Sequence, residues 1–201
     1  MGEKKLQNYS IAAYLDIDNQ STIKNEYHAG MIVAMSGGTL NHGIIGNNIN
    51  SEINHLLKSK NKKCTSINGD VKIFIEKANS YVYPDGMVIC GKIESDKTDK
   101  HSVTNPILVI EVLSKSTESY DRGAKFRKYR SLPSFCEYVL IDQYQPVVDV
   151  LYRGDATFWK MTTIIGLDKT VYLNALDIHI KMTDIYRNTI NLDNPQFNLD
   201  L

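Results

Sequence analysis

The sequence has no excess of charge of either sign, because 23 Lys and Arg residues are balanced by 23 Asp and Glu residues. A chain without net positive charge creates no long-range field that draws it to nucleic acid. The balance therefore argues against a non-specific DNA-binding protein. It does not exclude a nuclease, since a local basic patch and a bound metal ion can supply the contacts to phosphate.

The sequence also has no apolar run that approaches the length of a membrane-spanning helix, and its first residues lack the apolar core of a secretion signal. We therefore expect no membrane partner and a cytoplasmic protein. Cysteines are few: Cys64, Cys90 and Cys136 are odd in number and lie far apart along the chain. This pattern fits no pair of metal ligands and predicts reduced residues of the core.

No internal repeat, linker or low-complexity segment divides the chain. Its length of 201 residues suits one well-buried domain. We expect a single domain over residues 1–201, with a core from about 14 to 187 and a C-terminal tail over 188–201. The tail is rich in Asn and Asp, which predicts either a frayed end or an arm that packs on a partner.

Two apolar segments each carry one carboxylate. Residues 107–113 are apolar at every position except Glu111, which predicts a central strand covered on both faces. Asp85 follows Pro84, which cannot donate to a sheet, so Asp85 should lie at the start of a strand or on an edge. A buried carboxylate has to be paired, protonated or bound to a metal, because an unpaired buried charge is costly.

Two explanations fit these carboxylates, and the spacing of the residues does not decide between them. Asp85 and Glu111, pointing from neighbouring strands, would make a site for a hard cation. Alternatively, Asp85 caps a turn and Glu111 pairs with a Lys or Arg of the core.

A helix is predicted over residues 121–132, because the segment ends directly before Pro133. Helical spacing places four side chains on one face, namely Asp121, Lys125, Tyr129 and Leu132. Arg127 and Arg130 point away from that face. Lys125 is therefore the basic residue expected to face the sheet.

The remaining elements are predicted from alternation and helical periodicity. They are a short helix after Ser10, a hairpin over 25–35 that turns at Ala29–Gly30, a helix from Thr39 to about Leu57, strands over 64–68 and 71–75, a hairpin over 147–165 that turns at Gly154–Asp155, and a short helix over 182–187. These elements, with the two carboxylate strands, predict an α/β protein.

The motifs resemble the Uma-type restriction endonuclease family, which belongs to the PD-(D/E)XK nuclease superfamily. The resemblance lies in Tyr83-Pro84-Asp85 with Val88, Glu111-Val112-Leu113-Ser114 with Ser116-Thr117, Asp121 with Lys125 and Tyr129, and Glu137-Tyr138 with Asp142. It runs from about Tyr14 to about Tyr186. It implies a restriction endonuclease-like α/β fold, in which a mixed central sheet is flanked by helices.

The resemblance implies a metal-dependent endonuclease that acts on DNA, with Mg²⁺ as the cofactor and Mn²⁺ as a substitute. Asp85 and Glu111 would bind the metal, helped by the carbonyl of Val112. The superfamily places a lysine two residues after the second carboxylate, but Leu113 stands there. In this family the lysine is taken from the following helix, so Lys125 would orient or activate water and stabilise charge on phosphorus.

Two further residues are candidates through the same resemblance. Glu26 matches a Glu that precedes the hairpin turn and faces the active site in the family, where it could hold a metal-bound water. The residues alone leave it equally open as an exposed hairpin carboxylate. His42 matches a His found near the pocket and is a candidate phosphate contact, although a His in the first turn of a helix is usually structural.

A second hypothesis is a module that keeps the nuclease fold without turnover and binds nucleic acid or another protein. Fold does not imply function and the neutral charge favours caution, whereas the intact carboxylates and lysine argue against this hypothesis. A glycosidase built on two carboxylates would leave the lysine without a role. Enzymes of this fold often pair, so we expect a homodimer, with Val148, Val150 and Leu151 as apolar surface for the contact.

Overall fold

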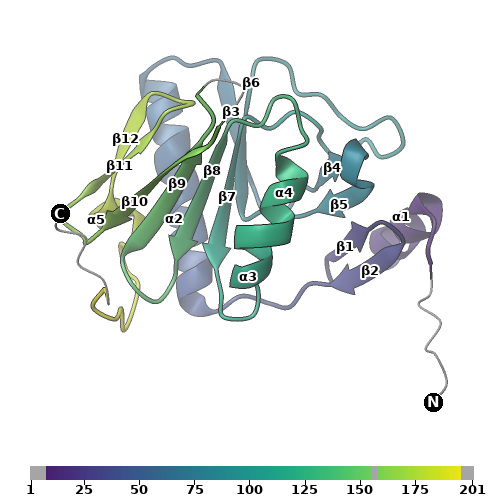
Figure 1. Ribbon diagram of the computed structural model, residues 1–201, viewed down its shortest axis with the longest axis horizontal. Coiled ribbons are helices and arrows are strands. Elements are labelled where there is room, and N and C mark those ends of the chain that lie inside the picture. Colours follow the sequence, from purple (N-terminus) through teal and green to yellow (C-terminus); the bar gives the residue numbers. More distant parts are fainter. Residues whose placement is uncertain (1–7, 155–157, 196–201) are drawn as a thin grey trace.

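The computed structural model describes residues 8–154 and 158–195 and has a six-stranded sheet at its centre, with the strand order β10-β9-β8-β7-β6-β3 (Figure 1). These strands are β3 (Cys64–Asn68), β6 (Gly86–Cys90), β7 (Leu108–Leu113), β8 (Glu137–Asp142), β9 (Val147–Tyr152) and β10 (Lys160–Ile165). β7 and β8 run parallel, and the other neighbours are antiparallel. The sheet is therefore mixed, as the sequence predicts.

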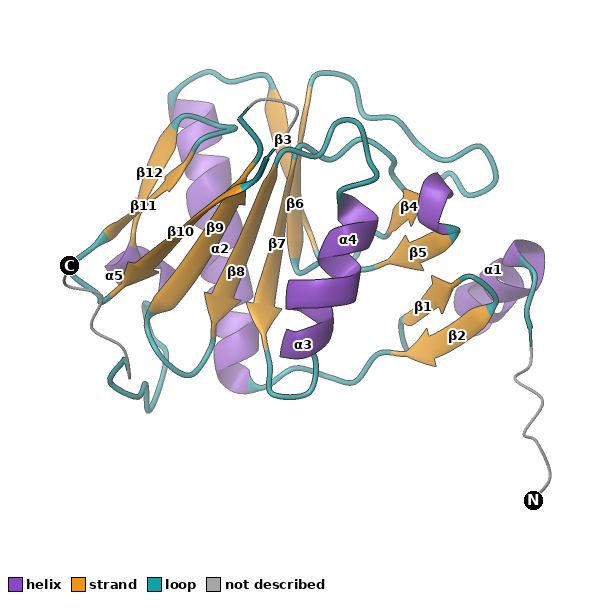
Figure 2. Ribbon diagram, viewed as in Figure 1, coloured by secondary structure: helices purple, strands orange, loops and turns teal. Residues whose placement is uncertain are grey.

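Helices cover the two faces of this sheet (Figure 2). α2 (Leu40–Ser59) lies along one face and is capped by the Thr39 hydroxyl, which accepts from the His42 N–H at 3.2 Å. On the other face, one continuous helical segment joins α3 (Glu118–Tyr120), a π-helical turn (Asp121–Lys125) and α4 (Phe126–Tyr129). Both predicted helices are confirmed, with the second shifted about three residues toward the N-terminus.

The alternation of side chains along β7 decides what faces each helix. Three of its residues join the apolar cluster that contains Ile45 and Ile49 of α2, namely Leu108, Ile110 and Val112. Val109 and Leu113 pack on the opposite face, in the cluster that contains Tyr129. Glu111 lies between them on this second face, so the strand points its carboxylate at the helical segment that carries Lys125.

A smaller sheet, in the order β2-β1-β5-β4, stands beside the central one (Figure 1). It consists of β1 (Asn25–His28), β2 (Met31–Ala34), β4 (Ile73–Ile75) and β5 (Ser80–Val82), and α1 (Ile11–Gln20) packs against it. The predicted turn at Ala29–Gly30 is confirmed, with φ angles of 48° and 103°. β3 and β4 follow each other as predicted, but they pair with strands of different sheets.

The C-terminal part covers the end of α2 with a two-stranded sheet and a short helix. These elements are β11 (Thr170–Leu173), β12 (Ile178–Lys181) and α5 (Met182–Ile185). The buried Glu137 carboxylate of β8 holds their turn, because it accepts from the N–H groups of Asn174 at 2.7 Å and Ala175 at 2.9 Å. The predicted hairpin of β9 and β10 is confirmed, whereas Asp155 of its turn lies outside the described residues.

Of the three residues predicted for a dimer contact, two are buried, and Leu151 is partly buried against the cluster on the other face of the sheet. Val148 and Val150 of β9 are buried in the apolar cluster beneath α2, at 0% and 3% exposure, because β11 and β12 cover this end of the sheet. The part of the tail that the structure describes also packs on its own chain. Asn41 of α2 exchanges two hydrogen bonds with the backbone of Ile190, through its amide nitrogen at 2.8 Å and its amide oxygen at 3.0 Å.

The prediction of three reduced cysteines is wrong for two of them. Cys64 of β3 and Cys90 of β6 are directly opposite each other across the antiparallel pair and form a disulfide. The sequence hid this pairing because the register of two strands separated by 26 residues is not a local property. Cys136 is free. The cysteines therefore no longer support the expectation of a reducing compartment.

Within residues 8–154 and 158–195, no helix combines the length and the apolar character that crossing a membrane requires.

We predict that the protein, denatured without a reductant, titrates with about one accessible thiol per chain, which belongs to Cys136. The same assay after reduction should count all three cysteines of the sequence. A count of three before reduction would show that β3 and β6 are held by their backbone pairing alone.

Candidate active site

The backbone brings Asp85 to the end of β7. Asp85 precedes β6, and its N–H donates to the Ile110 carbonyl at 3.1 Å. Its carboxylate Oδ2 in turn accepts from the Val112 N–H at 2.7 Å. These two bonds fix Asp85 on both sides of Glu111 in the neighbouring strand. The structure thus places the two predicted carboxylates at the same end of the central sheet.

Lys125 lies at the centre of an acidic cluster. Its ammonium Nζ is 2.8 Å from Oε1 of Glu111, 3.6 Å from Oε1 of Glu26 and 3.7 Å from Oδ1 of Asp121. It also donates to the Tyr83 carbonyl at 3.0 Å. The side chain is only 5% exposed. The lysine from the helix therefore reaches the second carboxylate, as the resemblance implies.

Glu26 points into this cluster and is not the exposed hairpin carboxylate that the sequence left open. Its Oε1 accepts from the Tyr83 N–H at 2.9 Å, and its Oε2 lies 3.1 Å from Nε2 of His28. Burial alone would raise the pKa of Glu26, but Lys125, His28 and the Tyr83 N–H together lower it. Glu26 is therefore ionised, and both of its oxygens are occupied.

The electrostatics of the cluster are dominated by burial. Burial raises the pKa of Glu111 well above the usual value. The nearby carboxylates of Asp121 and Asp85 raise this pKa further, whereas Lys125 lowers it. Burial likewise raises the pKa of Asp121, again opposed by Lys125. Burial would lower the pKa of Lys125, yet the carboxylates around it raise that pKa well above normal. Lys125 is thus a permanent cation among more acidic groups than it can neutralise.

Further side chains orient the carboxylates. The Tyr129 hydroxyl donates to Oε1 of Glu111 at 2.9 Å, and Nε2 of His42 is 3.3 Å from Oδ2 of Asp85. This bond to Asp85 raises the pKa of His42, although burial acts against it. His42 therefore lies beside the first carboxylate, as the resemblance suggested. Gln143 donates to the Leu113 carbonyl at 2.7 Å and so fixes the end of β7.

The oxygens of Asp85 and Glu111 are the donors that a divalent cation would use here. The contacts of Asp85 fall on Oδ2 and those of Glu111 on Oε1, which leaves Oδ1 and Oε2 without a partner among the described residues. Across 8–154 and 158–195, no three His, Cys, Asp or Glu side chains are grouped to hold a metal by themselves. Mg²⁺ nevertheless needs only one or two carboxylates beside water and substrate oxygens. The two free oxygens fit that requirement, and the Val112 carbonyl stays a predicted ligand.

The sequence analysis missed Lys128 and its neighbours. Lys128 follows Lys125 by three residues and Asp121 by seven, so it belongs to the same helix face. It reaches Nδ1 of His28 at 2.8 Å and the Tyr120 hydroxyl at 3.3 Å. Helical spacing contained this signal. A lysine in a run of basic residues, however, also fits a solvated helix face, so the sequence alone does not single out Lys128.

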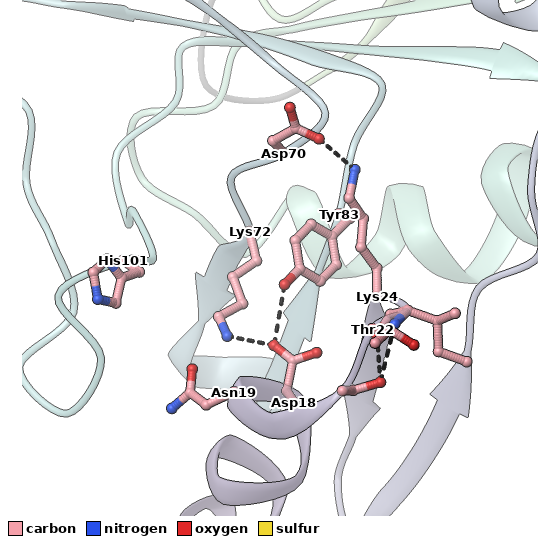
Figure 3. Close-up of a pocket in the computed structure, with 10 residues that line it drawn as sticks. Asp18, Asn19, Thr22, Lys24, Asp70, Lys72, Tyr83 and His101 are labelled. Atoms are coloured by element: carbon pink, nitrogen blue, oxygen red, sulfur yellow. Dashed lines mark hydrogen bonds and ion pairs between the residues drawn. The ribbon is translucent and has the colours of Figure 1, made fainter.

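A cavity of about 320 Å³ lies beside the acidic cluster and not on it. Tyr83 separates the two, because its backbone contacts Glu26 and Lys125 while its hydroxyl donates to Asp18 at 3.1 Å. Figure 3 shows Lys72 and the Tyr83 hydroxyl pointing at Asp18 from two sides. The bond from Lys72 to Asp18 measures 2.7 Å. None of the predicted site residues lines this cavity.

Comparisons with known proteins identify the family of this chain. A family model described as "Uma2: Putative restriction endonuclease" matches residues 11–183. The uncharacterized protein slr1290 of a Synechocystis strain is 34% identical over 87% of this chain and 89% of its own length. The uncharacterized protein sll1609 of the same strain is 31% identical over 83% of this chain and 93% of its own length.

A solved structure has the same fold. The crystal structure of a putative nuclease belonging to DUF820 from Anabaena variabilis superposes with a TM-score of 0.71 at 16% identity. The match covers 89% of this chain and 97% of the other. The restriction endonuclease-like mixed α/β fold predicted from the sequence is therefore confirmed.

We predict that Lys125→Met lowers the free energy of unfolding at pH 7 by about 3–5 kcal/mol, the cost of breaking a buried ion pair. The loss should shrink as the pH falls toward 5. Lys125 opposes the burial that raises the folded-state pKa of Glu111 and Asp121, so its removal raises these pKa values further. The folded variant then binds more protons than folded wild type and gains more stability as the pH falls.

Urea denaturation at several pH values measures both effects. The matched control is Arg127→Met on the exposed side of the same helix, which should change stability by less than about 0.5 kcal/mol. A Lys125→Met protein as stable as wild type at pH 7 would contradict the view that the ammonium holds this cluster together.

Proposed function

This chain belongs to the Uma2 restriction endonuclease family, and on that premise we propose that it is a metal-dependent endonuclease that hydrolyses phosphodiester bonds in DNA. One observation carries the proposal: the buried ammonium of Lys125 lies 2.8 Å from Glu111, at the centre of an acidic cluster beside Asp85. The cluster has more carboxyl groups than cations, and burial raises the pKa of Glu111 and Asp121, so a metal ion at this place would favour their ionised form.

Asp85 and Glu111 would hold Mg²⁺, or Mn²⁺ in its place, with the Val112 carbonyl as a further ligand. Such an ion supplies positive charge against the scissile phosphate and makes water a better nucleophile. The side chain of Asp85 is 24% exposed and that of Glu111 only 4%, so substrate and solvent would enter from the Asp85 side.

Lys125 would act as a hydrogen-bond donor to the charge that builds on the phosphate oxygens. Its pKa is raised well above normal by the surrounding carboxylates, so it keeps its proton at neutral pH and is a poor general base. A preorganised cation in a site with little water is worth more than one in solvent, because the local dielectric is low. Its contribution would thus be electrostatic.

Glu26 would be a positioning residue. Both of its oxygens already accept from the chain's own groups, which leaves little capacity for a metal-bound water. Its ion pair with Lys125 instead aims the ammonium toward Glu111. This role differs from the one that the resemblance implied, and it follows from the contacts of Glu26 in this chain.

The alternative is a module that binds nucleic acid without turnover. Such a module has no need of an acidic excess at the core, which opposes the approach of a phosphate backbone. A metal ion reverses that sign and makes the same carboxylates favourable for phosphate binding. The enzyme hypothesis therefore explains why the carboxylates are grouped here. Under the module hypothesis they only weaken binding of the phosphate backbone.

We predict that purified protein nicks supercoiled plasmid with Mg²⁺ or Mn²⁺ and not with EDTA. Asp85→Asn, which keeps the shape of the side chain, should abolish Mn²⁺ binding by calorimetry and lower cleavage by at least 10²-fold, in the range of losing one key electrostatic group. Asp70→Asn is the matched control, because Asp70 is an exposed carboxylate paired with Lys24 outside the cluster.

Lys125→Gln, assayed against the folded fraction measured by circular dichroism, should lower cleavage by about 10²–10³-fold. Arg127→Gln and Arg130→Gln, on the exposed side of the helix, should cleave like wild type. Cleavage that survives EDTA, or that Asp85→Asn leaves intact, would remove the metal-dependent mechanism and favour the binding module.

The homodimer also stays a prediction. It rests on the pairing expected of enzymes that cut two strands, since the apolar surface first assigned to the contact is buried. A light-scattering mass near 22.8 kDa at micromolar concentration would show that the protein is a monomer.

A further inference from the structure

Lys128 is a half-buried lysine beside the acidic cluster, and it has no carboxylate within 4.0 Å among the described residues. Its ammonium contacts Nδ1 of His28 at 2.8 Å and the Tyr120 hydroxyl at 3.3 Å. It also lies 5.4 Å from the centre of the Tyr120 ring. Lys128 thus differs from Lys125, whose charge is surrounded by acidic groups.

These contacts fix the hydrogens of His28. An ammonium group only donates, so Nδ1 of His28 has to accept from Lys128. Nε2 then carries the ring hydrogen and donates to Oε2 of Glu26 at 3.1 Å. The imidazole therefore bridges Lys128 to Glu26, and it brings no negative charge to the ammonium.

The ammonium of Lys128 keeps unused capacity. It has three N–H groups, of which His28 and Tyr120 accept two, and the third has no partner in the described parts of the chain. Burial lowers the pKa of Lys128, and the nearby cation of Lys125 lowers it further, although Glu26 acts the other way. A cation held in these surroundings gains from an anion that approaches its open side.

Lys128 lies where it could contact the backbone phosphate next to the one that is cut. Lys125 and Lys128 both lie near the Tyr120 ring, at 5.9 and 5.4 Å from its centre. They are three residues apart on one face of the helical segment, so their ammonium groups are neighbours. One strand could then present one phosphate near Lys125 and the next near Lys128.

We propose that Lys128, supported by His28 and Tyr120, forms a second phosphate-binding subsite, which takes the backbone phosphodiester adjacent to the one that is cut. The inference rests on the proposed function, because it takes nucleic acid as the substrate. It adds a contact that binds the substrate and does not take part in the chemical step.

The test measures DNA binding by fluorescence anisotropy at several salt concentrations, both in EDTA and with Ca²⁺, a hard cation that carboxylate oxygens also bind. For a duplex, the slope of log K against log salt is negative, and Lys128→Gln should make it less steep by about 0.9, the value for one lost phosphate contact. Lys128→Arg, which keeps the charge, should keep the wild-type slope. Arg130→Gln, exposed on the other side of the helix, is the matched control and should also keep it.

A second measurement locates the contact. A series of duplexes, each with one phosphate replaced by an uncharged methylphosphonate, should contain one position that weakens binding by wild type and has no effect on Lys128→Gln. This is a double-mutant cycle between the protein and a single phosphate. Loss of affinity at the same position in both proteins would overturn the subsite.

The competing explanation is that Lys128 only supports His28 and Glu26. It predicts an unchanged salt slope for Lys128→Gln together with slower cleavage, and that result would overturn the proposal. A wild-type protein that binds DNA but cuts none with Mg²⁺ or Mn²⁺ would refute the endonuclease, while the slope would still decide the subsite. A wild type that binds no DNA at low salt would refute the subsite directly.

Discussion

The ion pair between Lys125 and Glu111 is the interaction on which the rest of this region depends. Four segments that are distant in sequence converge on one ammonium: the hairpin through Glu26, the segment before β6 through Tyr83, the strand β7 through Glu111 and the π-helical turn through Asp121. Taking an ammonium out of water is costly unless its neighbours replace the lost solvation. Displacing any one of these segments would therefore remove part of the polar surroundings of Lys125 and weaken its contacts with the others.

The topology explains how a lysine from a helix can replace one from a strand. β7 and β8 are parallel, so the chain between them has to cross over one face of the sheet, and it does so as the helical segment from α3 to α4. Glu111 points to that face, and so does Leu113, which is buried among apolar side chains. The helical crossover packs over this face of the sheet, so Lys125 reaches Glu111 from the helix. Leu113, at the strand position where the superfamily has its lysine, stays apolar.

Much of the fold could be predicted from the sequence, because local patterns determine it. The apolar run around Glu111 predicted the buried strand β7, and the helical periodicity after Thr39 predicted α2. The predictions for Cys64 and for Val150 failed because strand register and the covering of β9 by later strands are non-local. For the candidate site, the residue types were predictable, whereas their contacts were not. Helical spacing alone cannot show that Lys128 meets a histidine of the hairpin.

Tyr83 belongs to two polar networks at once, and this restricts how the protein can move. Its peptide groups bond Glu26 and Lys125, and its hydroxyl bonds Asp18 at the end of α1, where Lys72 also binds (Figure 3). A rotation of the peptide that loosened Lys125 would also pull the ring away from Asp18. The first helix and the acidic cluster thus share Tyr83, so a substitution that displaced this residue would disturb both networks together.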